Sequence, residues 1–329
     1  MKKFITISLI ILSVISNETK SQNFFSNEPL AHTYSIVARD PETGEMGVAV
    51  QSHWFSVGSI VAWGEAGVGV VATQSFVNPS YGPKGLEMLR NGISPDEVVK
   101  YLTSTDEGRD VRQLAVLNVD GKVAAYTGKN CIPDAGHLTG NNYSVQANLM
   151  LNDKVWKAMS DAFESAKGPL AERMIASLEA AQNAGGDIRG QQSASILVVK
   201  GESTGKIWED RLIDLRVEDH ENPVGEIKRL LKVHRAYQHM NNGDVAVEKG
   251  DMQLAMKEYK AAEEMFPDNE EMKYWHAVTL TNNKLLDDAL PLFKIVFAKS
   301  NNWRLLTPRL IPIGLLNISE SELQLILKQ

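Results

Sequence analysis

The sequence has a single cysteine, Cys131, so an intramolecular disulfide and a cysteine-rich zinc site are both excluded. Its net charge of -7 provides no basic excess, and we therefore expect no nucleic-acid partner. The H-E-x-x-H zinc helix, the G-x-x-x-x-G-K phosphate loop and the G-x-S-x-G elbow are absent. The seven histidines are scattered without the spacing of metal ligands, so we expect neither a metal nor a cofactor.

A long apolar run is also missing, and we expect no transmembrane segment. The segment 4–15 is apolar over only about twelve residues, whereas a spanning helix needs roughly 20. This short run follows Lys2 and Lys3, a pattern typical of a secretion signal. We predict a signal peptide over residues 1–21, a leader segment over 22–32, and a secreted or periplasmic protein. An uncleaved membrane anchor is the alternative interpretation.

From residue 33 to 222, strand patterns alternate with pairs of helices. Asp120-Gly121 is a strong hairpin signal, and Ser94 with Glu97 forms a capping-box pattern at a helix start. The Gly-, Asn- and His-rich stretch 128–148 is expected to be a loop. Hairpins favour antiparallel sheets, and the helix pairs favour sheets covered by helices, which gives a layered α+β domain. The predicted strands cover 33–39, 46–51, 68–75, 113–119, 122–127, 193–200 and 211–218, with helices starting at Pro83 and Pro95 and covering 153–166 and 169–184.

From residue 223 to 329 the composition changes to Lys, Glu, Ala, Leu and Met, and the pattern becomes helical. A 34-residue repeat is present in this part of the chain. Its matched pairs are Gly243 with Ala277, Ala255 with Ala289, and Tyr259 with Phe293. This period resembles tetratricopeptide repeats, so we predict an all-α helical-repeat domain. Its small residues are expected to allow close helix packing, and a groove for a protein partner is the functional alternative.

Several polar motifs follow one another in a fixed order through the α+β part. They resemble the family called domain of unknown function 1028, over about residues 33–217. That family is classed with the N-terminal-nucleophile hydrolases, so the resemblance implies a four-layer αββα sandwich of antiparallel sheets. The motifs are 33–40, 47–50, 69–74, Gly136-His137, Gln146-x-Asn148 and the run 185–194.

The resemblance also implies a reaction and a set of site residues. In such hydrolases the first residue of the mature chain attacks an amide carbonyl through its side chain, and its own α-amino group is the base. Thr33 is the matching residue here, provided that the chain is cut between His32 and Thr33. The candidates for binding or polarising a small amide or peptide-like substrate are His53, Asn78, Asn148, Asp187 and Arg189.

Two functions stay open at this point. The first is a secreted amidohydrolase with Thr33 as the nucleophile. The second is a non-catalytic binding or assembly protein, in which the αββα fold is kept and the helical tail binds a partner. Proteasome-like members use a lysine in the early strands, and no lysine lies between Thr33 and Gly82, which favours the second function. Association into a homo-oligomer stays open under both.

Overall fold

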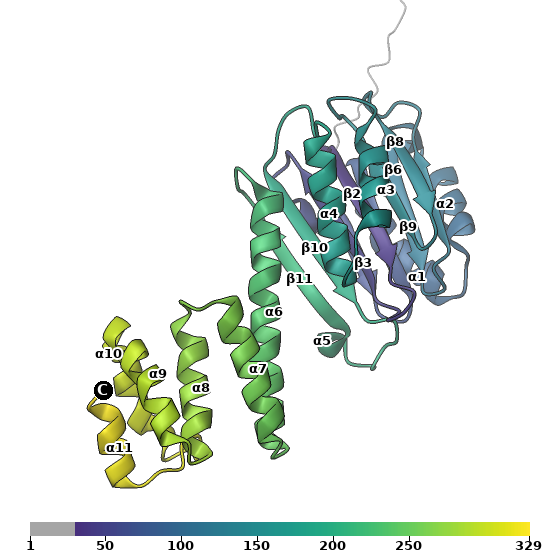
Figure 1. Ribbon diagram of the computed structural model, residues 1–329. Coiled ribbons are helices and arrows are strands. Elements are labelled where there is room, and N and C mark those ends of the chain that lie inside the picture. The colour runs from purple at the N-terminus through teal and green to yellow at the C-terminus, as the bar shows by residue number, and fades with distance from the viewer. Residues whose placement is uncertain (1–29) are drawn as a thin grey trace, which may run out of the picture.

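The computed structural model describes residues 30–329, so the predicted signal peptide and most of the predicted leader lie outside the described residues. Two antiparallel sheets and their helices are followed by a helical C-terminal region (Figure 1). This confirms the expected α+β class with an all-α part behind it. In residues 30–329 no helix is both long enough and apolar enough to cross a membrane.

The larger sheet has six strands in the order β11-β10-β3-β2-β9-β8, and all of its neighbours are antiparallel. Its centre is formed by β2 and β3, which the Asp40–Gly44 turn joins. The predicted strand over 33–39 is confirmed residue for residue. The strands are β2 (Thr33–Arg39), β3 (Met46–Ser52), β8 (Gly136–Gly140), β9 (Tyr143–Ala147), β10 (Ser193–Val199) and β11 (Arg211–Val217).

Within residues 30–329 the second sheet has five strands: β1 (Leu30–Ala31), β4 (Ala62–Glu65), β5 (Gly69–Phe76), β6 (Arg112–Asn118) and β7 (Val123–Thr127). One edge of β5 pairs with β6. The other edge is shared by two short strands, β4 beside Gly69–Ala72 and β1 beside Ser75–Phe76. The two residues before His32 are therefore part of a sheet.

Buried clusters hold these elements together. One cluster joins side chains of both sheets, such as Val37 and Val50 from the larger sheet with Val70 and Ala72 from β5. A second cluster packs α1 and α2 on β5 and β6, and a third packs α3 and α4 on the larger sheet. Burial of these apolar side chains is the main force that fixes the sheets together. The helices are α1 (Tyr81–Arg90), α2 (Pro95–Ser104), α3 (Val155–Ser165), α4 (Leu170–Asn183) and α5 (Ile207–Asp210).

One local prediction is confirmed and another is wrong. Ser94 and Glu97 form the expected capping box at the start of α2. The expected loop over 128–148 instead contains the hairpin of β8 and β9, which turns at Asn142 with a φ of 64°. In β9, the buried Ser144 and Gln146 alternate with the apolar Tyr143, Val145 and Ala147, and both polar side chains make hydrogen bonds. The prediction of a loop overlooked this short alternation, and β8 is a partly exposed strand at the edge of the sheet.

The helical region begins with α6 (Pro223–Glu248), a 26-residue helix that is shared by both parts of the molecule. Val224, Ile227 and Leu231 join the core of the larger sheet, while Ala236 and Ala246 pack in the tail. The remaining helices are α7 (Met252–Met265), α8 (Glu270–Asn282), α9 (Leu286–Lys299), α10 (Asn301–Leu306) and α11 (Glu320–Leu327), and α8 to α11 lie away from the sheets (Figure 1).

The residues of the 34-residue repeat lie in two successive helix pairs, α6 with α7 and α8 with α9. All six are buried. At Gly243, a Cβ atom would lie 2.7 Å from Cε1 of Tyr259, which is too close for any side chain. The predicted role of Gly243 in close helix packing is therefore confirmed.

Candidate functional site

Thr33 is the first residue of β2 and is fully buried. Its side chain lies in the space between the two sheets, because Ser35 and Val37 on the same face contact residues of the smaller sheet. The Thr33 Oγ1 hydroxyl donates a 2.6 Å hydrogen bond to the carbonyl oxygen of Ala31. The hydroxyl is therefore held beside the chain segment that precedes it.

The carbonyl oxygen of His32, which belongs to the peptide bond before Thr33, accepts two side-chain hydrogen bonds. Ser52 Oγ donates to it at 2.5 Å, and Arg189 Nη2 donates at 2.9 Å. Ser52 is directly opposite Thr33 in the pairing of β2 with β3, so the register sets the first contact. A hydroxyl and a guanidinium on one oxygen polarise that carbonyl and stabilise negative charge on it.

Arg189 is oriented by Asp187. The carboxylate accepts from Arg189 Nε at 3.0 Å and from Nη2 at 2.7 Å. Asp187 is only 3% exposed, and it also accepts the backbone N–H groups of Arg189 and His53. The loop that carries the pair leaves α4 through Gly185 and Gly186, whose φ angles of 123° and 60° favour glycine. The buried Asp187 carboxylate thus pairs with a guanidinium whose side chain is 28% exposed, and the two hydrogen bonds between them hold that guanidinium in one place.

The imidazole of His32 is buried against two partners. Its Nδ1 lies 2.9 Å from Asn148 Oδ1, and because that oxygen only accepts, Nδ1 is the donor. The ring meets Phe76 edge to face at a centroid distance of 5.3 Å. Burial lowers the pKa of His32, with the hydrogen bond to Asn148 acting in the opposite direction. The neutral ring is therefore the form that this site favours.

Behind Thr33 lies a buried network of uncharged amides and hydroxyls. Gln74 Nε2 donates to Gln113 Oε1 at 2.6 Å and to the carbonyl oxygen of Thr33 at 3.2 Å. Asn148 Nδ2 donates to Gln113 Oε1 at 2.9 Å and to the same carbonyl at 3.3 Å. Ser35 accepts from Gln146 and donates to Gln74. Such a satisfied network fixes the backbone of Thr33 without adding charge.

The structure brings together four of the six residues named from the sequence: Thr33, Asn148, Asp187 and Arg189. His53 adjoins them through its backbone N–H, while its exposed ring lies 3.3 Å from the carbonyl oxygen of Gln191.

Asn78 makes its contacts in a different group, since its side chain bonds Asp106 and Ser80. The pKa of Asp106 is lowered to about 2: burial alone would raise it, but hydrogen bonds from Arg112 and Tyr81 outweigh that effect. Asp106 with these partners holds together the turn after β5, and Asn78 is part of that turn.

Sequence reasoning missed Ser52, His32, Gln74 and Gln113. Ser52 follows the predicted strand 46–51 by one residue and is paired with the first residue of the strand 33–39, so a hairpin drawn from the turn would have placed it opposite Thr33. Gln74 and Gln113 face each other across β5 and β6, also in register. The sequence signal that could have identified these residues is the position of polar residues at matching ends of paired strands.

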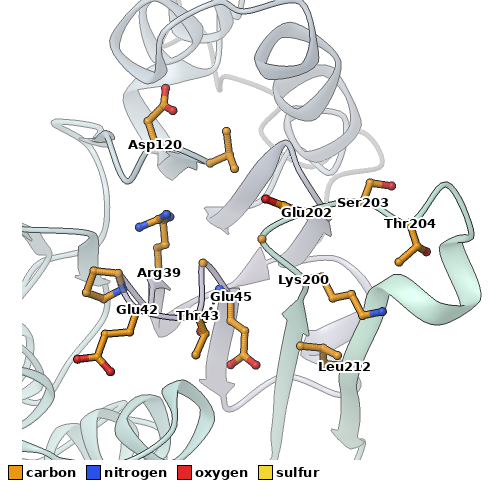
Figure 2. Close-up of a pocket in the computed structure, with 14 residues that line it drawn as sticks. Arg39, Glu42, Thr43, Glu45, Asp120, Lys200, Glu202, Ser203, Thr204 and Leu212 are labelled. Atoms are coloured by element: carbon orange, nitrogen blue, oxygen red, sulfur yellow. Dashed lines mark hydrogen bonds between the residues drawn. The ribbon is translucent and has the colours of Figure 1, made fainter.

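Of two cavities in the α+β part, one lies far from Thr33 and the other borders the amide network. The first, of about 840 Å³, has charged side chains from the end of β2 and the turn after it, from the β6–β7 turn and from the loop after β10, among them Arg39, Glu42, Asp120, Lys200 and Glu202 (Figure 2). Arg39 ends the strand that Thr33 begins, roughly 20 Å away at 3.3 Å per residue, so this cavity is remote from Thr33. The second, of about 700 Å³, includes Thr127, which accepts a hydrogen bond from Gln113, and thus borders the amide network.

Comparison with known proteins places the α+β part in a family. No curated protein matches the sequence. A crystal structure of a protein from Silicibacter pomeroyi, described as a DUF1028 member, shares 32% identical residues, covers 61% of this chain and 85% of that chain, and superposes with a TM-score of 0.56. The model of the family of unknown function DUF1028 matches residues 33–227, which is more than half of the sequence. The chain therefore belongs to the DUF1028 family.

Proposed function

We propose that this chain is a secreted or periplasmic amidohydrolase of the N-terminal-nucleophile type, which acts on a small amide or peptide-like substrate with Thr33 as its nucleophile. One observation carries the proposal: the carbonyl oxygen before Thr33 is held by Ser52 and by Arg189. The core shared by the two sheets, with helices on their outer faces, supports the four-layer αββα arrangement of such enzymes.

The first step is a cut between His32 and Thr33. Thr33 Oγ1 and the His32 carbonyl carbon belong to adjacent residues, so attack closes a five-membered ring. The C–N bond then breaks, an ester forms between His32 and Thr33 Oγ1, and the hydroxyl proton passes to the released amine of Thr33. Water hydrolyses the ester and leaves a His32 carboxylate and a free Thr33 amine. Ser52 and Arg189 stabilise the oxyanion that forms in both stages.

The second step uses the freed amine as a general base. With a pKa of roughly 8, an α-amino group can accept the Thr33 hydroxyl proton near neutral pH. Thr33 Oγ1 attacks the substrate amide, the proton passes to the leaving amine, and water hydrolyses the acyl ester. Arg189 supplies positive charge to this site, which has no lysine in the first strands. The buried network behind Thr33 keeps the nucleophile in position.

Intact mass of the purified protein tests this proposal. The expected product is a chain that begins at Thr33, and the Thr33→Ala variant is expected to keep the residues before it. Thr33→Ser is the matched control, because a serine hydroxyl can make the same attack. A wild-type chain that begins at residue 22 and stays intact during storage would rule the mechanism out.

The second candidate function is a binding or assembly protein whose tail binds a partner. The observation that favours it is an apolar-lined cavity of about 620 Å³ between α4, α6 and α7, which includes Ile175, Leu231 and Met265. The helix pairs α6–α7 and α8–α9 support a tetratricopeptide-like tail of this kind. If wild type and Thr33→Ala are equally inactive against an amide library, this function is preferred.

A further inference from the structure

We propose that Ala31 and His32 occupy the acyl side of the site as a built-in substrate mimic. The substrate class that follows is a peptide or peptide-like acyl compound that binds as a short strand at the edge of β5 that Leu30 and Ala31 occupy before the cut. It carries a small side chain, then a neutral ring with an N–H donor, directly before the cleaved bond. This inference rests on the proposed amidohydrolase function and names the substrate class of the same site.

The backbone of the leader supports a strand-like mode of binding. Leu30 and Ala31 pair antiparallel with Phe76 and Ser75 at the end of β5. On the same edge, β4 pairs only with residues 69–72. After the leader departs with the cut, an extended peptide can take the place of Leu30 and Ala31 beside the end of β5. Main-chain pairing of this kind does not depend on the side chains of the peptide.

The ring of His32 points to the side chain that the site accepts next to the cleaved bond. Asn148 Oδ1 accepts a hydrogen bond from the ring, and Phe76 packs on it edge to face. His32 as a whole is 3% exposed, and burial lowers the pKa of its ring, so the site favours a neutral group. A carboxylate could not donate to Asn148 Oδ1, and a lysine would bury a charge without a partner.

Ala31 indicates that the substrate carries a small residue at the position before the neutral ring. Its methyl group is fully buried in the core between the sheets, and its carbonyl oxygen accepts from Thr33 Oγ1. Opposite it, Ser75 has a φ of 74°, which is an unfavourable backbone conformation for a residue other than glycine. Strained backbone conformations of this kind are common at ligand-binding sites, where the surrounding structure stabilises them. A larger side chain at this position would have to displace packed core atoms.

The test uses the full chain after its own cut, with the leader removed by buffer exchange. The probes are the p-nitroanilides of acetyl-Leu-Ala-His, acetyl-Leu-Ala-Asp and acetyl-Leu-Leu-His. We expect kcat/KM for the first probe to exceed that of each of the other two by at least about tenfold, as for a residue that fills a shaped pocket. In the Asn148→Leu variant, the ratio of kcat/KM for the histidine probe to kcat/KM for the aspartate probe is expected to fall. A purely structural defect would lower kcat/KM for all three probes by the same factor.

The outcomes separate this inference from the proposed function. A chain that stays uncut overturns both. A cut chain that hydrolyses the three probes equally overturns only the substrate class. If the cut chain releases no p-nitroaniline, calorimetry with the free acids Leu-Ala-His and Leu-Ala-Asp decides. Tighter binding of the histidine peptide supports the mimic, and equal or absent binding overturns it.

Discussion

Replacing Ser52 by alanine should slow the cut between His32 and Thr33 by about 100-fold. Removal of one oxyanion donor in other enzymes costs about 100- to 1,000-fold in rate. We expect the lower end because the second donor, Arg189, stays in place at 2.9 Å and carries a charge. The net loss of one hydrogen bond costs only about 1 kcal/mol of stability, so the variant is expected to fold.

The assay refolds the denatured full chain by dilution, stops samples in acid at intervals and measures the cut fraction by intact mass. Ser177→Ala is the matched control, because Ser177 is also fully buried and its Oγ also donates to a backbone carbonyl, that of Met159, at 3.0 Å. The control is expected to cut at the wild-type rate. If Ser52→Ala cuts within threefold of wild type, polarisation of the His32 carbonyl is not what drives the cut.

Three further predictions concern the framework around the site. Gly243→Leu is expected to lower the thermal midpoint of the tail and to cost roughly 1–3 kcal/mol, because its Cβ atom alone would lie 2.7 Å from Tyr259. Circular dichroism tests this, with Val245→Leu at an exposed position of the same helix as the comparison. Hydrogen bonds, first from His276, lower the pKa of Glu263 to about 2, so its stabilisation is present above pH 4.5 and is lost as the pH falls towards 2. Glu263→Gln should flatten that acid dependence, and an unchanged melting profile would contradict it. Asp106→Asn is expected to cost about 3 kcal/mol in urea unfolding, because it removes the negative charge of an ion pair with the buried Arg112.

The parts of the fold that could be predicted are those in which one residue pattern has one structural solution. The alternating apolar residues of 33–39 and the Asp40–Gly44 turn predict a strand and its return, and both are present. The capping box of Ser94 and Glu97 is equally local. Thr33 was found in this way, as the start of a strand, together with the resemblance to a family.

The parts that could not be predicted depend on contacts between distant residues. Within the described residues, β1 (Leu30–Ala31) is defined by its pairing with Phe76 and Ser75, which lie on a distant strand. One face of β9 is polar because Gln146 donates to Ser35 in the buried amide network, a contact between distant residues that a local pattern cannot reveal. Arg189 was named as a candidate, yet its contact with the carbonyl of His32 spans 157 positions of the chain.

The missing lysine and the presence of Arg189 both concern the source of positive charge near Thr33. A lysine in an early strand would place its charge beside the nucleophile through the local register. In this chain the charge near Thr33 comes from Arg189, which reaches the site from the loop after α4 and is aimed by Asp187. A guanidinium stays charged and cannot act as a base, so in the proposed mechanism the amine of Thr33 must accept the proton. The absence of lysine therefore does not by itself favour a non-catalytic role, and it makes the cut after His32 the decisive event for this protein.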